Sequence, residues 1–356
     1  MKRLFTLALA AVMAIAAMAQ ASQQPTLPVI PNDEAVRFGQ LENGMKYYIR
    51  HNDKQKGLAD FYIIHNVGAI QEDDNQQGLA HFLEHMAFNG TKNLPGKMLI
   101  EWCERVGIKF GANLNAGTSW DYTQYLIKDV PVARQGVIDT AMLILHDWSH
   151  FITLDHSEID KERGVINEEW RMRRSAMMRM YEASFPKLYA GSKYANRMPI
   201  GTMDVVMNFK YDDLRSYYHK WYRPDLQGIV VVGDIDVDQM EQKIKNLFGP
   251  IKMPANAAPL EYYPVPDNEQ PIFVSHTDKE MPAELVWAFV KYDILPREIR
   301  NSDAQYITDY LFSVADIMLS ERLNELSLKA DAPFGNAGGG FGEFLLSTYK
   351  GAILTV

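Results

Sequence analysis

The sequence is poor in cysteine and has no excess of positive charge. Its 356 residues include a single cysteine, Cys103, so no disulfide can form within the chain. We expect this cysteine to be a small buried apolar residue rather than a metal ligand. Acidic residues outnumber basic ones by 45 to 36, which gives a formal net charge of −9. Nucleic acids and anionic membranes attract basic proteins, so neither is expected as a main partner.

Long apolar runs are also scarce. An uncharged, largely apolar run from Leu4 to Met18 follows the basic start Met1-Lys2-Arg3, but it is shorter than the ~20 residues of a spanning helix. Small residues at Ala17-Met18-Ala19 offer a cleavage site, with Ala19-Gln20-Ala21 as a second choice. The sequence therefore predicts a secretory signal peptide over 1–21 and a periplasmic or secreted bacterial protein without a membrane span. A membrane anchor is the alternative.

Proline-rich stretches divide the rest of the chain. Three prolines mark 22–35 as an extended leader, and four mark 251–268 as a linker. Between them, 36–250 has the length of a first domain. Beyond the linker, 269–356 predicts a second, homologous domain that ends inside an expected strand, so we expect that domain to be incomplete.

Local patterns predict a mixture of strands and helices. Alternating apolar positions on both sides of Asn43-Gly44 predict a β-hairpin. Further strands are expected at 61–64, 229–232, 272–274, 285–290 and 352–356, and helices at 95–106, 131–151, 155–180, 237–248 and 303–328.

The segment from Gly78 to Gly90 predicts a helix with two different faces. Histidines at i and i+4 have Cβ atoms about 5–6 Å apart and can reach one tetrahedral zinc ion. The order His-x-x-Glu-His is the inverted zincin signature, in which the glutamate is suited to act as general base on a water held by the metal. A helix with a solvated polar stripe is the alternative. The apolar face carries Leu79, Phe82, Leu83 and Met86, and the polar face carries His81, Glu84 and His85.

A third ligand has to come from elsewhere in the chain. Glu162 and Glu169 share a face of the helix expected at 155–180, roughly 10 Å apart along its axis. Only one of them can closely approach a given ion, and Glu168 points about 100° away. A carboxylate oxygen is an acceptable third zinc ligand beside two histidines. A solvated acidic face is the alternative interpretation of these residues.

The segment from Gly111 to Leu126 is rich in threonine and aromatic residues and predicts two strands with a sharp turn. It could form a sheet edge that binds the substrate backbone by strand addition. An ordinary buried strand pair fits the pattern equally well.

Together these motifs resemble the pitrilysin and insulysin family of zinc peptidases, in the style of its bacterial secreted members. The segment Gly78–Thr91 looks like that family's metal helix, and Glu162 followed by Glu169 is similar to its downstream pair of glutamates. The stretch from Asn115 to Tyr125 is similar to its substrate-strand motif.

The resemblance implies an α+β fold of repeated α/β sandwich domains, each with an antiparallel sheet packed against helices. It also implies one Zn²⁺ per chain. By position, the zinc ligands would be His81, His85 and Glu169, the general base Glu84, a supporting carboxylate Glu162, and the substrate-binding residues Asn115, Ala116 and Thr118.

The function that we expect is that of a zinc metalloendopeptidase that hydrolyses extended peptides or small unfolded proteins. In the family, a second half contributes an arginine and a tyrosine that help to hold substrate, and this chain ends before such a half. The alternative is therefore a catalytically incompetent fragment or subunit that binds zinc or peptide. It would need a C-terminal half or a partner subunit to close a chamber.

Overall fold

The computed structural model describes residues 28–134, 136–295, 300–344 and 347–355. The expected signal peptide and the first part of the leader, 22–27, lie outside these residues. The chain divides into a larger unit, Asp33–Leu285 with Glu343–Lys350, and a smaller unit formed by Met1–Asn32, Val286–Gly342 and Gly351–Val356. None of the helices among the described residues combines the length and hydropathy needed to cross a bilayer.

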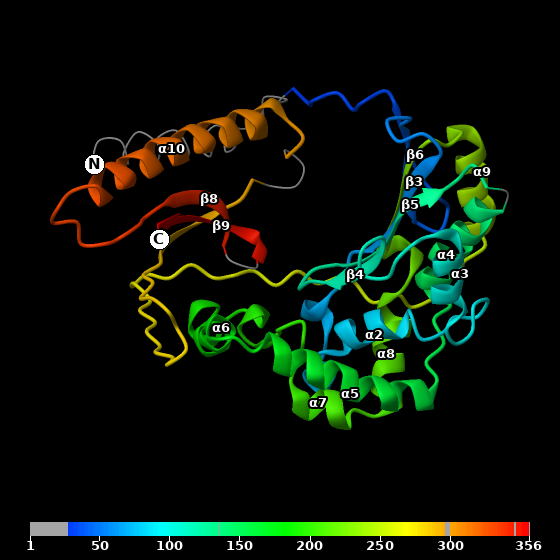
Figure 1. Ribbon diagram of the computed structural model, residues 1–356, viewed down its shortest axis with the longest axis horizontal. Coiled ribbons are helices and arrows are strands. Elements are labelled where there is room, and N and C mark those ends of the chain that lie inside the picture. The colour runs from blue at the N-terminus through cyan, green and yellow to red at the C-terminus, as the bar shows by residue number, and fades with distance from the viewer. Residues whose placement is uncertain (1–27, 135, 296–299, 345–346, 356) are drawn as a thin grey trace. The chain divides into compact units, whose positions relative to one another are not determined.

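A six-stranded sheet organises the larger unit (Figure 1). Four of its pairings are antiparallel, as expected, but β2 and β6 run parallel. Parallel neighbours need a long crossover connection, and here the helical segments that precede β6 supply it. The strand order is β1 (Val36–Gln40), β2 (Lys46–His51), β6 (Gln227–Gly233), β3 (Leu58–His65), β5 (Thr123–Pro131) and β4 (Leu114–Thr118).

Burial alternates along the central strands β3 and β6, because successive side chains of a strand point to opposite faces of the sheet. Helices α4 (Val137–His150) and α9 (Val237–Phe248) pack against strands of this sheet and against each other (Figure 1). The apolar face of α2 (Leu79–Met86) is completely buried, and Cys103 is buried as expected. The α+β fold predicted from the sequence is therefore confirmed.

One predicted helix is divided in the structure because a capping residue starts a new helix within it. The helix expected at 155–180 is two helices, α5 (His156–Arg173) and α6 (Ala176–Leu188). The Ser175 side chain accepts a hydrogen bond from Met178 N and caps α6, so a new helix starts there. The remaining helices of the unit are α3 (Met98–Val106), α7 (Met203–Asn208) and α8 (Tyr211–Trp221), and the 3₁₀ turns are η1 (Ala69–Gln71), η2 (Asp74–Gln76), η3 (Lys193–Asn196) and η4 (Pro224–Leu226).

The C-terminal region contributes a three-stranded sheet and one long helix, α10 (Asp303–Ser327). The strand expected at 272–274 is not formed: this segment has no ladder partner among the described residues, and Phe273 is 86% exposed. The strand expected at 285–290 begins later. The sheet order is β7 (Ala288–Asp293), β9 (Ser347–Thr355) and β8 (Gly339–Phe344).

Candidate metal centre

Helix α2 starts at a position that only glycine fills easily. Gly78 has φ +98°, and a Cβ atom there would lie 3.0 Å from Ile200 O and from Gly201 Cα. The two oxygens of the buried Glu72 side chain accept hydrogen bonds from Gly78 N at 3.0 Å and from Ala80 N at 2.8 Å. Acceptors for the free amides of a first turn stabilise that end of the helix. The first turn of α2, which carries His81, is therefore tightly held.

The structure brings His81, His85 and Glu169 together. One ligand atom from each residue lies within 4.8 Å of the others. Glu169 Oε2 is 3.3 Å from His85 Nε2 and 3.6 Å from His81 Nε2. A tetrahedral zinc with ligand distances of about 2.0–2.1 Å has ligand atoms about 3.3–3.4 Å apart, so this set of two nitrogens and one oxygen fits a zinc ion.

Glu162 lies on the other side of the His85 ring. Its Oε1 accepts a hydrogen bond from His85 Nδ1 at 2.7 Å, and its Oε2 accepts one from Asn89 Nδ2 at 2.6 Å. An ionised carboxylate can only accept, so Glu162 holds a proton on His85 Nδ1, and Nε2 is the nitrogen that would bind a metal once it has lost its own proton. Glu168, by contrast, pairs with Arg171 at an exposed part of α5.

Two supporting residues of the centre were not singled out from the sequence. Arg173 lies 2.8 Å from Glu169 Oε1 and so leaves Oε2 to face the histidines. Arg173 follows Glu169 by four residues on one helix, and this spacing could have predicted the ion pair between them. Asn89 lies inside the metal-helix motif, but nothing in its spacing indicated Glu162 as its partner.

The protonation of the cluster follows from its burial and its carboxylates. Burial, and then the neighbouring His85 charge, lowers the pKa of His81 to about 4. Burial also acts to lower the pKa of His85, but hydrogen bonds to Glu162 and Glu169 outweigh it and raise that pKa to about 9. The pKa values of Glu162 and Glu169 are lowered, because their bonds to His85 and nearby charges outweigh burial. Ionised carboxylates beside histidine nitrogens form an environment suited to a cation.

Glu84 is placed beside this cluster without belonging to it. The residue is 8% exposed, and its Oε2 accepts a hydrogen bond from Thr118 Oγ1 at 2.7 Å. Burial raises the pKa of Glu84, and the hydrogen bond from Thr118 opposes that rise. A carboxyl group with a raised pKa next to a metal-binding cluster is suited to accept a proton.

The stretch expected to bind substrate is an edge strand. β4 is the last strand of the six-stranded sheet and pairs with β5. Asn115 is exposed and Ala116 is partly exposed. The hydroxyl of Thr118 points to Glu84, so the end of this edge reaches the polar face of α2.

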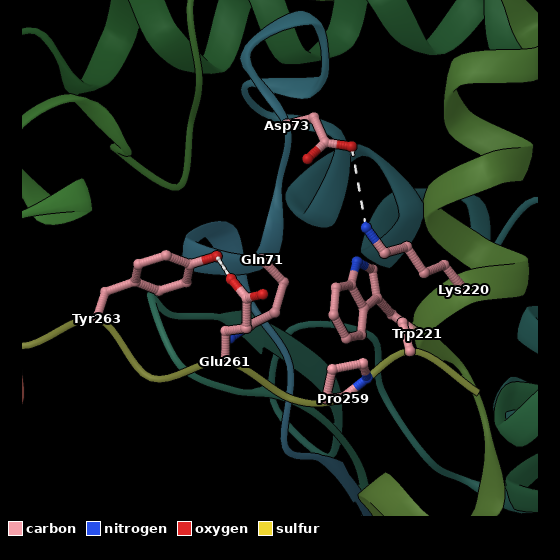
Figure 2. Close-up of a pocket in the computed structure, with 8 residues that line it drawn as sticks. Gln71, Asp73, Lys220, Trp221, Pro259, Glu261 and Tyr263 are labelled. Carbon is pink, nitrogen blue, oxygen red and sulfur yellow. Dashed lines mark hydrogen bonds and ion pairs between the residues drawn. The ribbon is translucent and has the colours of Figure 1, made fainter. Parts of the chain in front are cut away.

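A recess with about 510 Å³ of empty space, partly open to solvent, lies elsewhere on the larger unit. Figure 2 shows Tyr263 and Glu261 on one side and Trp221 and Lys220 on the other. Its charged groups already have partners: Tyr263 donates a hydrogen bond to Glu261 at 2.9 Å, and Lys220 lies 4.0 Å from Asp73. It shares no residue with the metal cluster, which lies where α2, α5 and β4 converge.

The sequence resembles those of known proteins. Residues 48–194 match the family model of insulinase, Peptidase family M16, and residues 208–332 match the model of the Peptidase M16 inactive domain. The probable zinc protease PqqL of Escherichia coli is 36% identical over 297 residues, which cover 83% of this chain and 31% of that protein. The zinc protease PQQL-like of Arabidopsis thaliana is 31% identical, with the same two coverages. The chain thus spans about a third of the length of these relatives.

Solved structures show the same fold. The crystal structure of the first half of the periplasmic protease PqqL from Escherichia coli matches with a TM-score of 0.79 at 31% identity, over 92% of this chain and 69% of that one. Pitrilysin, at 19% identity and a TM-score of 0.68, covers 94% of this chain and 35% of its own. The two family models, the shared fold and the identity to zinc proteases show that this chain belongs to the insulinase peptidase family, M16.

Proposed function

We propose that this protein is a zinc-dependent endopeptidase that hydrolyses extended peptides or small unfolded proteins. The observation that carries the proposal is the convergence of His81, His85 and Glu169 from two helices, with Glu84 next to them. These three residues would hold one zinc ion per chain. Relatives named as zinc proteases support the choice of metal and of reaction class.

In this proposal the side chains of the centre have separate tasks. When bound, zinc supplies Lewis acidity, which polarises the scissile carbonyl and lowers the pKa of a water towards ~7. The Glu84 carboxylate accepts a proton from the attacking water and passes it to the leaving amine. Glu162 orients His85, and Arg173 orients Glu169, through the hydrogen bond and the ion pair that they make.

The position of β4 supports extended substrates. A peptide that adds to a sheet edge is held by its backbone, so it must be extended but can vary in sequence. Asn115 and Ala116 would lie beside that backbone. Folded proteins rarely offer a free extended segment of this kind, whereas peptides and unfolded chains do.

Cellular location and assembly are part of the same proposal. A relative described as a periplasmic protease supports export to the bacterial periplasm. The second candidate function is zinc or peptide binding without turnover, in a chain that needs a C-terminal half or partner subunit to close a chamber. The 31% coverage of the Escherichia coli relative favours keeping this candidate.

The test combines metal analysis with cleavage of an internally quenched peptide. Wild type is expected to hold one zinc per chain and to cleave, and Glu84→Gln to hold the same zinc and not to cleave. Glu168→Gln is the matched control on α5, because that side chain is exposed and pairs with Arg171, and it should keep both properties. Full activity of Glu84→Gln would contradict the assigned base. Zinc without cleavage in wild type would favour the second candidate, and absence of zinc would favour a peptide-binding subunit.

A further inference from the structure

The side chain of Thr118, on the edge strand β4, contacts the proposed general base Glu84. Its Oγ1 donates a hydrogen bond to Glu84 Oε2 at 2.7 Å. A threonine hydroxyl has one proton to donate. While that proton is given to Glu84, Thr118 cannot donate a hydrogen bond to a substrate carbonyl.

The backbone around Thr118 is fixed on several sides. Thr118 pairs with Thr123 of β5, and the buried Thr123 hydroxyl donates to Val67 O at 3.0 Å. In the following turn, Ser119 O accepts from Ala69 N at 3.1 Å. A β-branched side chain on such a backbone has few rotamers, so the Thr118 hydroxyl is a rigid donor.

Glu84 needs such a donor. Its side chain has several rotatable bonds, and burial alone does not select one orientation of the carboxylate. The bond from Thr118 occupies one lone pair of Oε2 and leaves Oε1 for proton transfer. Small displacements of a catalytic group slow the reaction strongly, since a misplacement of about 1 Å can lower a rate about 100-fold.

We propose that Thr118 is a positioning residue that orients the general base Glu84 and so couples the edge strand β4 to the reacting centre. This inference rests on the proposed peptidase function. It replaces the expectation that Thr118 lies beside the substrate backbone, and it leaves Asn115 and Ala116 in that role. Its effect should therefore be on turnover rather than on substrate binding.

Two substitutions separate the hydroxyl from the shape of the side chain. Thr118→Val keeps the branched shape and removes the donor, and Thr118→Ser keeps the donor. For cleavage of a quenched peptide, we expect kcat of Thr118→Val to fall about 10- to 100-fold, with KM within about twofold and zinc content unchanged. Thr118→Ser should recover most of the lost kcat. Thr140→Val controls for the substitution itself, because Thr140 lies on α4 and its hydroxyl donates a hydrogen bond to Gly136 O rather than to a residue of the centre.

A binding measurement gives a readout that does not depend on turnover. In the inactive Glu84→Gln background, adding Thr118→Val should leave the Kd for the uncleaved peptide within about twofold. A weaker Kd would mean that Thr118 contacts the substrate and would overturn the inference. Unchanged kcat in Thr118→Val, or equal loss in Thr118→Ser, would also overturn it.

These outcomes are distinct from failure of the proposed function. An inactive wild type, or an active Glu84→Gln, overturns the peptidase mechanism and the positioning of its base together. An active wild type, an inactive Glu84→Gln and a fully active Thr118→Val would leave the peptidase function standing and refute this inference alone.

Discussion

Replacing Glu162 by glutamine should weaken zinc binding while it leaves all three proposed ligands in place. Glu162 accepts two hydrogen bonds, from His85 Nδ1 at 2.7 Å and from Asn89 Nδ2 at 2.6 Å. Glutamine has one acceptor oxygen, so its amide group must face one of these two donors. If the amide faces His85, it favours the tautomer with the proton on Nε2, the atom that would bind the metal.

The expected loss of zinc affinity follows from the hydrogen bond between Glu162 and His85. Loss of the hydrogen-bond partner of a metal-binding histidine typically weakens metal affinity about 10- to 100-fold. That range corresponds to about 1.4–2.7 kcal/mol, which agrees with about 1.5–3 kcal/mol for a hydrogen bond to a charged group. The expected result is therefore a Kd for zinc about one to two orders of magnitude higher than that of wild type.

The assay is competition for zinc between the protein and a chromophoric chelator at fixed pH, with circular dichroism to check that each variant is folded. Glu168→Gln is the control, since Glu168 lies on the same helix but pairs with Arg171 at the surface. It should bind zinc as wild type does. If Glu162→Gln keeps the wild-type Kd, or if the control loses as much affinity, the reasoning about His85 is wrong.

Three further predictions concern stability, and each is measured by urea unfolding. Burial raises the pKa of Glu72 to about 8, well above its ordinary value in an unfolded chain. The folded state therefore binds the proton more tightly than the unfolded state does. The free energy of unfolding should fall as pH rises from about 4.5 to about 8. Glu72→Gln should flatten this dependence, and equal slopes for both proteins would contradict it. Leu83→Ala should lower the free energy of unfolding by about 2–5 kcal/mol, because Leu83 is completely buried. Met172 is 81% exposed, so Met172→Ala should change that free energy by less than about 0.5 kcal/mol. Gly78→Ala should destabilise more than Gly107→Ala: both glycines have positive φ, but a Cβ atom at 78 meets backbone at 3.0 Å and one at 107 meets nothing within 4 Å. Equal losses would show that crowding at position 78 does not matter.

The polar face of α2 was predictable because it depends on local periodicity. Spacing on a helix placed His81 and His85 side by side, and the same periodicity buried the opposite face. The α+β class was also accessible, through the hairpin and the succession of strands and helices.

Spacing alone could not decide between Glu162 and Glu169, since both share one face of α5. The resemblance indicated Glu169 as the ligand. In the structure, His85 faces Glu169 with Nε2 and Glu162 with Nδ1, so the two ring nitrogens give the two carboxylates different positions.

Contacts between distant segments were beyond prediction. The bond from Thr118 to Glu84 and the capping of α2 by Glu72 depend on how a strand turn and a loop pack against one helix. The parallel pairing of β2 with β6 is of the same kind, because no local pattern indicates which strand will be inserted between two others.

The insertion of β6 between β2 and β3 affects how the chain folds during synthesis. β2 and β3 lie close in the sequence, yet each pairs with β6, which is synthesised much later. A nascent chain that has not reached Gln227 therefore carries two strands that each have one unpaired edge, and such edges are sites of aggregation. During synthesis such a chain would depend on chaperones, and a chain that ends before β6 should aggregate rather than fold.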